Sequence, residues 1–210
     1  MSNADLRMGS EQRLWELIEQ RADPGADVDK IDSKIWELFG ETWAVIFTDL
    51  AGFSRQVAKF GIIHFLQVIY ESKRMLFPII SQQGGFLVKA EADSLLLVFR
   101  SPATALRCAI EMQHACQIAS ARKVAEEKVL LGLGIGYGSI LRIGEHDVWG
   151  AEVNAASKLG EDAAQADDIL VTASVKNEVG VIEGISYDNL DEVVPGSDEN
   201  YRVVYKKAGN

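Results

Sequence analysis

Cysteine, proline and long apolar runs are all scarce in this sequence. Its 210 residues include two cysteines and four prolines. No stretch approaches the roughly 20 apolar residues that a membrane helix needs, so we expect no membrane span. Residues 1–10 are polar and lack the apolar centre of a secretory signal. These absences together predict a cytoplasmic protein.

The two cysteines, Cys108 and Cys116, fall within one predicted helix. The helical rise places them about 12 Å apart, which is too far for a disulfide. We expect both to be small core residues rather than nucleophiles.

Positive charge is also in deficit, with 21 basic residues against 31 acidic ones and a net charge of −10. Such a surface repels phosphate backbones, so we expect no nucleic-acid partner. A local basic pocket for a single triphosphate stays compatible with this balance. The hydrophobic content of 48% is enough for a core, and the length suits one domain with a short extension.

The first 40 residues predict two short helices, over residues 10–20 and 29–39, with a breaker at 22–25. We therefore divide the chain into an N-terminal helical arm, residues 1–40, and a main domain, residues 41–210. The arm either packs on the core or acts as a dimer-stabilising or regulatory element, and the sequence favours neither.

The main domain opens on a buried strand, Trp43 to Phe47, followed by a helix over residues 61–83. Two strands, 86–89 and 95–99, then form a hairpin, and a helix starting at Ser101-Pro102 leads to a strand over 129–143. This order predicts the α+β class, with a ferredoxin-like βαββαβ core, extra strands after it and the N-terminal helical arm. Many unrelated functions use this fold.

Four glycines, at positions 132, 134, 136 and 138, alternate along the last of these strands and so lie on one face of it. We prefer close packing, under a helix or against another backbone, over a phosphate loop as their role, because no helix starts directly after them.

Two carboxylates stand out. Asp49 follows the first buried strand, and Asp93 lies at the tip of the hairpin. Neighbouring strands would bring both to one point, where a carboxylate pair suits Mg²⁺ or Mn²⁺. The alternative is that Asp49 caps a helix and Asp93 is a turn residue.

Three separated motifs strengthen the metal interpretation. They are Phe47-Thr48-Asp49-Leu50-Ala51-Gly52-Phe53-Ser54, Lys89-Ala90-Glu91-Ala92-Asp93, and His146-Asp147-Val148-Trp149-Gly150-Ala151-Glu152-Val153-Asn154-Ala155-Ala156-Ser157-Lys158. In this order they resemble the motifs of class III adenylate/guanylate cyclase catalytic domains. The resemblance covers about residues 42–204 and leaves out the arm.

The resemblance implies a lyase that makes a cyclic nucleotide and pyrophosphate from a nucleoside triphosphate, at a homodimer interface. Asp49 and Asp93 would hold two Mg²⁺ or Mn²⁺ ions per site, and Gly52 and Phe53 of the first motif would bind substrate. The other roles fall to the second and third motifs: Lys89 and Asp147 would read the base, Asn154 the ribose, and Lys158 the transition-state phosphate. The metal carboxylates and the other four side chains would come from opposite subunits.

Lys89 can only donate hydrogen bonds and an ionised Asp147 can only accept them, which complements adenine and favours ATP as substrate. The sequence departs from the commonest family pattern at Lys158, where arginine is usual, and at Ala92, where glycine often precedes the aspartate. Two alternatives therefore stay open: a cyclase for another base, and a catalytically silent nucleotide-binding or dimerisation module.

Overall fold

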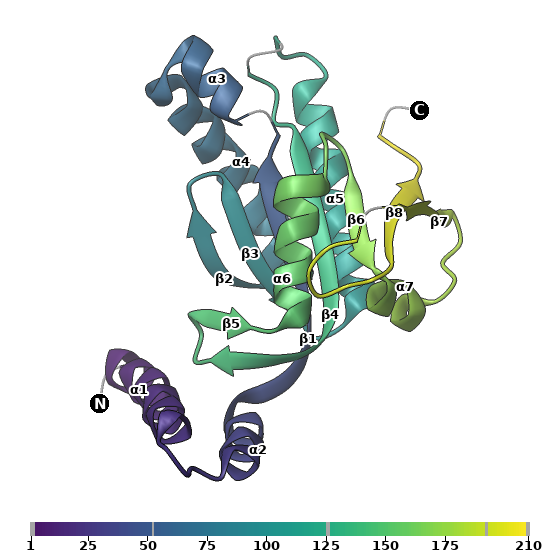
Figure 1. Cartoon of the computed structure of the whole chain (residues 1–210). Coiled ribbons are helices and arrows are strands. Elements are labelled where there is room, and N and C mark those ends of the chain that lie inside the picture. The colour runs from purple at the N-terminus through teal and green to yellow at the C-terminus, as the bar shows by residue number, and fades with distance from the viewer. Residues whose placement is uncertain (1–2, 52, 125–126, 192, 209–210) are drawn as a thin grey trace.

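The structure is a computed structural model and describes residues 3–51, 53–124, 127–191 and 193–208. Its strands form one mixed sheet with helices on both faces (Figure 1). The strands are β1 (Gly40–Leu50), β2 (Phe86–Glu91), β3 (Ser94–Phe99), β4 (Leu131–Ile143), β5 (Asp147–Trp149), β6 (Ile169–Thr172), β7 (Ile185–Leu190) and β8 (Asn200–Tyr205). The helices are α1 (Asn3–Ala22), α2 (Val28–Phe39), α3 (Phe53–Phe60), α4 (Ile62–Gln82), α5 (Pro102–Ser120), α6 (Ala151–Lys158) and α7 (Ala173–Val179), with a π-helical turn, η2 (Leu159–Ala163), after α6.

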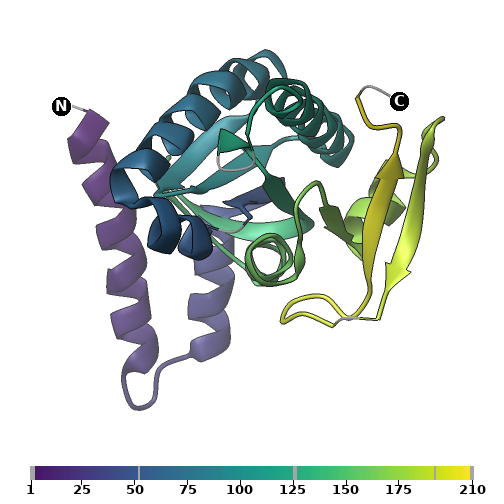
Figure 2. The same cartoon turned by 90° about the horizontal axis from the view of Figure 1, so that it is seen from above.

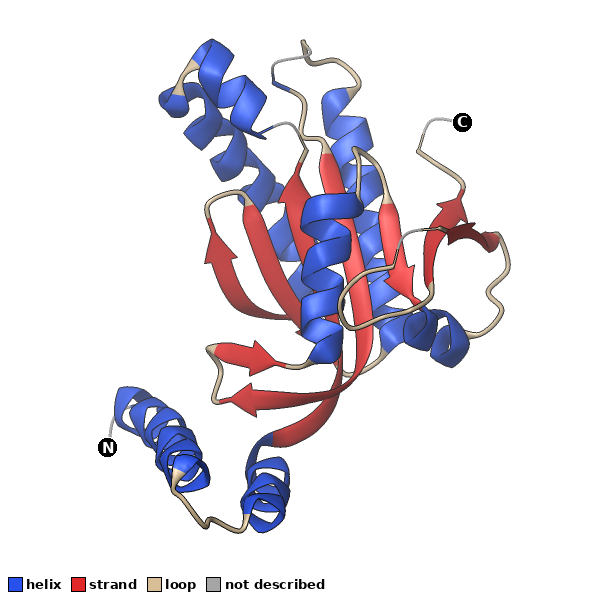
Figure 3. Ribbon diagram, viewed as in Figure 1, coloured by secondary structure: helices blue, strands red, loops and turns tan. Residues whose placement is uncertain are grey.

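The sheet confirms the ferredoxin-like core. Its order is β2-β3-β1-β4-β6-β8-β7, with β5 paired to β4 (Figure 3). Strand β3 lies antiparallel between β1 and β2, and β1 is also antiparallel to β4, which is the split βαβ arrangement. The remaining strands extend this core, since β6 pairs in parallel with β4 and carries β8 and β7 outward.

Alternate residues of β1 face two different layers. Ala44 and Ile46 point into the main core under α4 and α5, whereas Trp43 and Val45 pack with residues of α6 and β5. Figure 2 shows α4 and α5 on one side of the sheet and α6 on the other. Asp49 shares the face of Trp43 and Val45, because side chains alternate along a strand. The candidate site therefore lies on the α6 side.

The glycines of β4 let α6 and η2 lie directly on the sheet. A Cβ atom at Gly134 would sit 2.2 Å from the carbonyl oxygen of Ala156, and one at Gly136 would sit 2.4 Å from that of Glu152. Both distances are far inside van der Waals contact, so only glycine allows this approach. The alternating glycines at positions 132, 134, 136 and 138, called the glycine track below, therefore pack closely under a helix, as predicted.

The N-terminal arm is a pair of helices, α1 and α2, at one end of the sheet (Figure 1). Leu14 and Leu17 of α1 are buried with Phe39 of α2 and Ile143 of β4. The guanidinium of Arg21 donates two hydrogen bonds, of 2.5 and 3.1 Å, to the Asp32 carboxylate and thereby joins the two helices. The arm is thus packed on the end of β4.

Several boundaries differ from the sequence expectation. β1 runs to Leu50, so Asp49 lies inside the strand rather than after it. Asp147 belongs to a short strand, β5, that was not predicted. The elements α3 and β7 were not predicted, and both are short, at eight and six residues.

Both cysteines are buried in α5 and free, as predicted. Burial raises the pKa of each thiol to about 12, so neither is a nucleophile at neutral pH. Within the described part of the chain, no helix combines the length and apolar character needed to span a bilayer.

Candidate active site

The structure brings the two predicted carboxylates together. Asp49 is the penultimate residue of β1, and Asp93 lies in the turn between β2 and β3. β1 and β3 pair through Thr48 and Leu95, and the Leu95 N–H donates a 3.1 Å hydrogen bond to the buried Thr48 hydroxyl. This hydrogen bond holds the end of β1 beside the hairpin tip, and the Asp49 and Asp93 carboxyl groups lie close enough for each to shift the pKa of the other.

The carboxyl pair carries more negative charge than its surroundings compensate. Burial raises the pKa of Asp49 to about 6, and the charges of Asp93 and Glu161 add to the rise. Burial also raises the pKa of Asp93, while its hydrogen bond to Asp49 and the charge of Lys73 act in the opposite direction. Two neighbouring carboxylates repel each other when both are ionised, and a cation between them would relieve that repulsion.

These oxygens fit a hard divalent cation. Mg²⁺ is usually bound by one or two carboxylates together with substrate phosphates rather than by a cage of protein ligands. The described residues contain no group of three or more His, Cys, Asp or Glu side chains placed to hold a metal ion. Asp49 and Asp93 are the residues that would hold one.

The hairpin tip that carries Asp93 is strained. Ala92 has a φ of +46°, in the left-handed region that residues with a Cβ atom adopt at a cost of about 1–2 kcal/mol. Glycine adopts this conformation without that cost, which is a physical reason for a glycine to precede the aspartate in such a turn. Alanine is accommodated here in the same turn.

A second pair of predicted residues also meets. The Lys89 ammonium of β2 lies 2.9 Å from Asp147 Oδ1 of β5, and the Val148 N–H donates a further 2.9 Å hydrogen bond to that oxygen. The two side chains are 40% and 30% exposed, so both can be reached by a ligand. One donor-only and one acceptor-only group thus stand side by side.

Lys89 lies between two hollows. The first, of about 230 Å³, is formed with Asp147 and with side chains from α1, β4 and β5. The second, of about 280 Å³, lies towards α6 and includes Phe47, Ser157 and Glu161. Glu161 is also the residue whose charge acts on Asp49. The second hollow thus extends from Lys89 towards Glu161, which is near enough to Asp49 to act on its pKa.

Asn154 and Lys158 lie four residues apart on α6, as predicted, and both are engaged within the chain. The Asn154 amide donates a 3.1 Å hydrogen bond to the Pro195 carbonyl oxygen. The Lys158 ammonium lies 2.8 Å from Asp162 Oδ2, and this hydrogen bond raises the pKa of Lys158. Lys158 is charged at neutral pH, and its exposed ammonium has further donors beyond the one that contacts Asp162.

Sequence reasoning missed Glu152, which ties α6 to the sheet. Its carboxylate accepts hydrogen bonds from the Tyr137 N–H at 3.0 Å, the Thr172 hydroxyl at 3.0 Å and the Ser174 hydroxyl at 2.8 Å. Room for it comes from Gly136, where a Cβ would lie 2.8 Å from Glu152 Oε2. The alternating glycines were the signal that a side chain would occupy this space.

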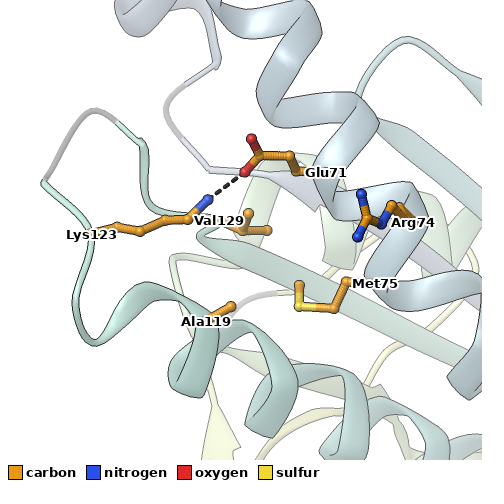
Figure 4. Close-up of a pocket in the computed structure, with 6 residues that line it drawn as sticks. All are labelled: Glu71, Arg74, Met75, Ala119, Lys123 and Val129. Carbon is orange, nitrogen blue, oxygen red and sulfur yellow. Dashed lines mark hydrogen bonds and ion pairs between the residues drawn. The ribbon is translucent and has the colours of Figure 1, made fainter.

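Two predicted substrate-binding residues cannot be placed. Gly52 lies outside the described residues, and of Phe53 only its position at the start of α3 is described. A larger hollow of about 460 Å³ lies elsewhere, between α4 and the end of α5, and is crossed by a Glu71–Lys123 ion pair (Figure 4). The six residues that form its described walls include none of the predicted site residues.

Comparison with known families places these features in context. The sequence profile described as "Adenylate and Guanylate cyclase catalytic domain" matches residues 40–203, which is most of the chain. Among curated proteins, a 69-residue segment is 30% identical to the serine/threonine-protein kinase pkn2 of Myxococcus xanthus. That segment is 33% of this chain and only 8% of the kinase.

Solved structures agree with the profile. An adenylate/guanylate cyclase/hydrolase from Silicibacter pomeroyi is 26% identical, with a TM-score of 0.67 over 80% of this chain and 99% of that one. The adenylyl cyclase CyaB from P. aeruginosa has a TM-score of 0.67 at 19% identity, over 80% of this chain and 96% of its own. A guanylate cyclase domain from Catenaria anguillulae, solved with GTP, reaches 0.65 at 18% identity, over 80% of this chain and 98% of that domain. Relatives of both base specificities thus share the fold.

Proposed function

We propose that this chain is a nucleotidyl cyclase that converts ATP to cyclic AMP and pyrophosphate. The chain belongs to the adenylate and guanylate cyclase catalytic domain family, which is the basis of this proposal. The reaction forms a bond between the ribose 3′-oxygen and the α-phosphorus, and it breaks the bond from that phosphorus to the pyrophosphate oxygen. Such a transfer needs positioning and charge neutralisation above all.

The meeting of Asp49 and Asp93 is the observation that carries the proposal. In this proposal the two carboxylates hold two Mg²⁺ or Mn²⁺ ions, which, when bound, neutralise the triphosphate and acidify the attacking hydroxyl. The raised pKa of Asp49 supports it, because a buried carboxylate with acidic neighbours gains from a cation.

The remaining contacts to substrate come from the other motifs. We assign the ribose to Asn154 and the negative charge that develops on the transferred phosphoryl group to Lys158, with Gly52 and Phe53 as further substrate-binding residues. The proposed positions of Asn154 and Lys158 are supported by the tight seat of α6 on the glycine track, because a rigid helix fixes both side chains.

We propose a homodimer as the active form. In this arrangement the carboxyl pair of one subunit faces the Lys89–Asp147 pair of its partner, so each dimer contains two equivalent sites. A monomer would then lack half of each site and be inactive.

Adenine is the proposed base because of the Lys89–Asp147 pair. The Lys89 ammonium can donate to the adenine ring nitrogen, and the Asp147 carboxylate can accept from the exocyclic amino group. Guanine presents the opposite polarity at these two places, so it would leave both charged groups unmatched.

The proposal is tested by incubating the purified chain with Mn²⁺ and each of the four common ribonucleoside triphosphates in turn. We expect cyclic AMP from ATP and at least tenfold less product from the others. Asp49→Ala is the control and should form none, because the site loses a metal ligand. Efficient product formation from GTP or a pyrimidine triphosphate instead would overturn the adenine assignment while leaving the cyclase in place.

A silent nucleotide-binding module is the second candidate, and one observation favours it. Lys158 stands where arginine is usual, so it lacks the bidentate fork, and in the structure its ammonium is paired with Asp162. If the second candidate holds, ATP raises the thermal stability of the chain but yields no cyclic product. The Lys158→Arg variant then also forms no cyclic product. Appreciable turnover by the unaltered chain excludes this candidate.

A further inference from the structure

The hollow beside the base-reading pair has a wall that the cyclase motifs do not supply. Its lining includes Lys89 and Asp147, but also Glu11, Leu14 and Trp15 of the N-terminal arm. The family match begins at residue 40, so these three residues lie outside it. The arm therefore closes one side of a space that the proposed function assigns to the base.

The character of this hollow suits a flat aromatic ring. Two indoles line it, from Trp15 on α1 and Trp149 on β5, and they are 55% and 54% exposed. Tryptophan faces are good stacking surfaces for nucleobases, whatever the base. The volume of about 230 Å³ is below the roughly 300 Å³ at which drug-sized pockets begin, so the hollow suits one ring system rather than a whole nucleotide.

Trp15 is held in place rather than carried on a loose segment. Its neighbour Leu14 is 8% exposed and packs in the cluster that joins α1 to β4, and Leu17 is fully buried there. Arg21 and Asp32 fasten α1 to α2, which leads directly into β1. A wall built on fixed elements can contribute to binding without a large ordering cost.

We propose that Trp15 of the N-terminal arm is part of the base subsite and determines nucleotide affinity together with Lys89 and Asp147. This inference rests on the proposed function, and it adds to the three cyclase motifs a residue from outside the family domain. It assigns the arm a role in substrate binding, beyond its packing on β4.

A binding experiment on the full chain separates this role from general stability. The probe is 3′-deoxyATP, which lacks the attacking hydroxyl and so binds without turnover, and its dissociation constant is measured calorimetrically in the presence of Mg²⁺. The variants are Trp15→Ala and Trp15→Phe. Trp36→Ala is the matched control, because Trp36 is an exposed tryptophan (46%) on the other helix of the arm and does not line the hollow.

We expect Trp15→Ala to raise the dissociation constant about fivefold to tenfold. This is the lower part of the range expected when a base loses one stacking surface. Trp15→Phe should recover most of the affinity, because it restores a ring. Trp36→Ala should bind as the unaltered chain does. Inorganic tripolyphosphate, which has no base, should bind the unaltered chain and Trp15→Ala with the same dissociation constant.

The outcomes separate a failure of the Trp15 assignment from a failure of the proposed cyclase function. If the unaltered chain binds 3′-deoxyATP and Trp15→Ala binds it equally well, the inference is wrong and the proposed function stands. Equal losses in Trp15→Ala and Trp36→Ala also overturn it, since the arm would then act only through stability. If the unaltered chain binds neither 3′-deoxyATP nor tripolyphosphate, the proposed function fails and the inference with it.

Discussion

The Lys89 ammonium and the Asp147 carboxylate lie 2.9 Å apart, joining the edge strand β2 to the short strand β5. They are separated by more than fifty positions in the chain, and only the return of β4 into β5 brings them together. Both are about a third exposed, so the pair contributes at most about 1 kcal/mol to stability. The pair therefore adds little to folding and remains accessible to a ligand.

Removing one partner should therefore damage specificity more than stability. We expect Lys89→Ala to lower kcat/KM for ATP at least tenfold, because the base loses its donor, while the free energy of unfolding changes by less than about 1 kcal/mol. Steady-state kinetics and urea denaturation measure the two quantities. Lys207→Ala is the matched control, since Lys207 forms a comparable exposed ion pair with Asp167 away from both hollows. An unchanged kcat/KM in Lys89→Ala would contradict the base-reading role.

Asp49→Asn should stabilise the folded chain at neutral pH while abolishing turnover. The pKa of Asp49 is raised in the folded state to about 6 from 3.8, so folding favours its protonated form. Its contribution is fully present below about pH 4 and is lost as pH rises through 6, at a cost of about 1–3 kcal/mol at pH 7. Urea denaturation of both proteins at pH 4 and pH 7, with chelator present, measures this difference.

The same pair of proteins tests cation binding. Mn²⁺ should raise the stability of the unaltered chain at pH 7 and leave Asp49→Asn nearly unchanged, because a ligand that binds only the folded state stabilises it by mass action. Asp188→Asn, on the exposed surface of β7, controls for the loss of one negative charge. If all three proteins respond equally to Mn²⁺, Asp49 is not a metal ligand.

Ala92→Gly should relieve the strained turn before Asp93. Glycine removes the cost of a left-handed φ but adds freedom to the unfolded chain, so we expect a net gain of roughly 0–1 kcal/mol. Ala90→Gly provides the comparison, because Ala90 lies in β2 without a positive φ and should lose about 0.5–1 kcal/mol. Thermal denaturation of both variants decides the point, and equal losses in the two would mean that the turn is unstrained.

Gly134→Ala should dislodge α6. Its Cβ would meet the Ala156 carbonyl oxygen at 2.2 Å, so the helix must move, and we expect a loss of about 2–3 kcal/mol together with most of the activity. Gly132→Ala is milder, because its nearest contact would be the Ala164 Cβ at 3.1 Å. Similar stability and turnover in the two variants would show that α6 does not depend on the glycine track.

Local patterning was sufficient to predict the core elements. The unbroken apolar run at Trp43–Phe47 indicated a buried strand, and the glycines of β4 indicated a helix lying on it, because both signals depend only on neighbouring residues. The short elements α3, β5 and β7 escaped prediction. A strand as short as β5 is stabilised by its partner β4 rather than by its own propensity.

Sequence and tertiary structure also determined different parts of the chemistry of the site. Residue type alone determined that Lys89 donates, that Asp147 accepts and that Asp49 and Asp93 suit a hard cation, because these are properties of the functional groups themselves. Only the tertiary structure decided which groups meet. The sheet places the end of β1 beside a hairpin tip and so raises the pKa of Asp49. It also places Trp15 of the arm and Asp147 around the same hollow, because the meeting of distant segments depends on how the layers pack.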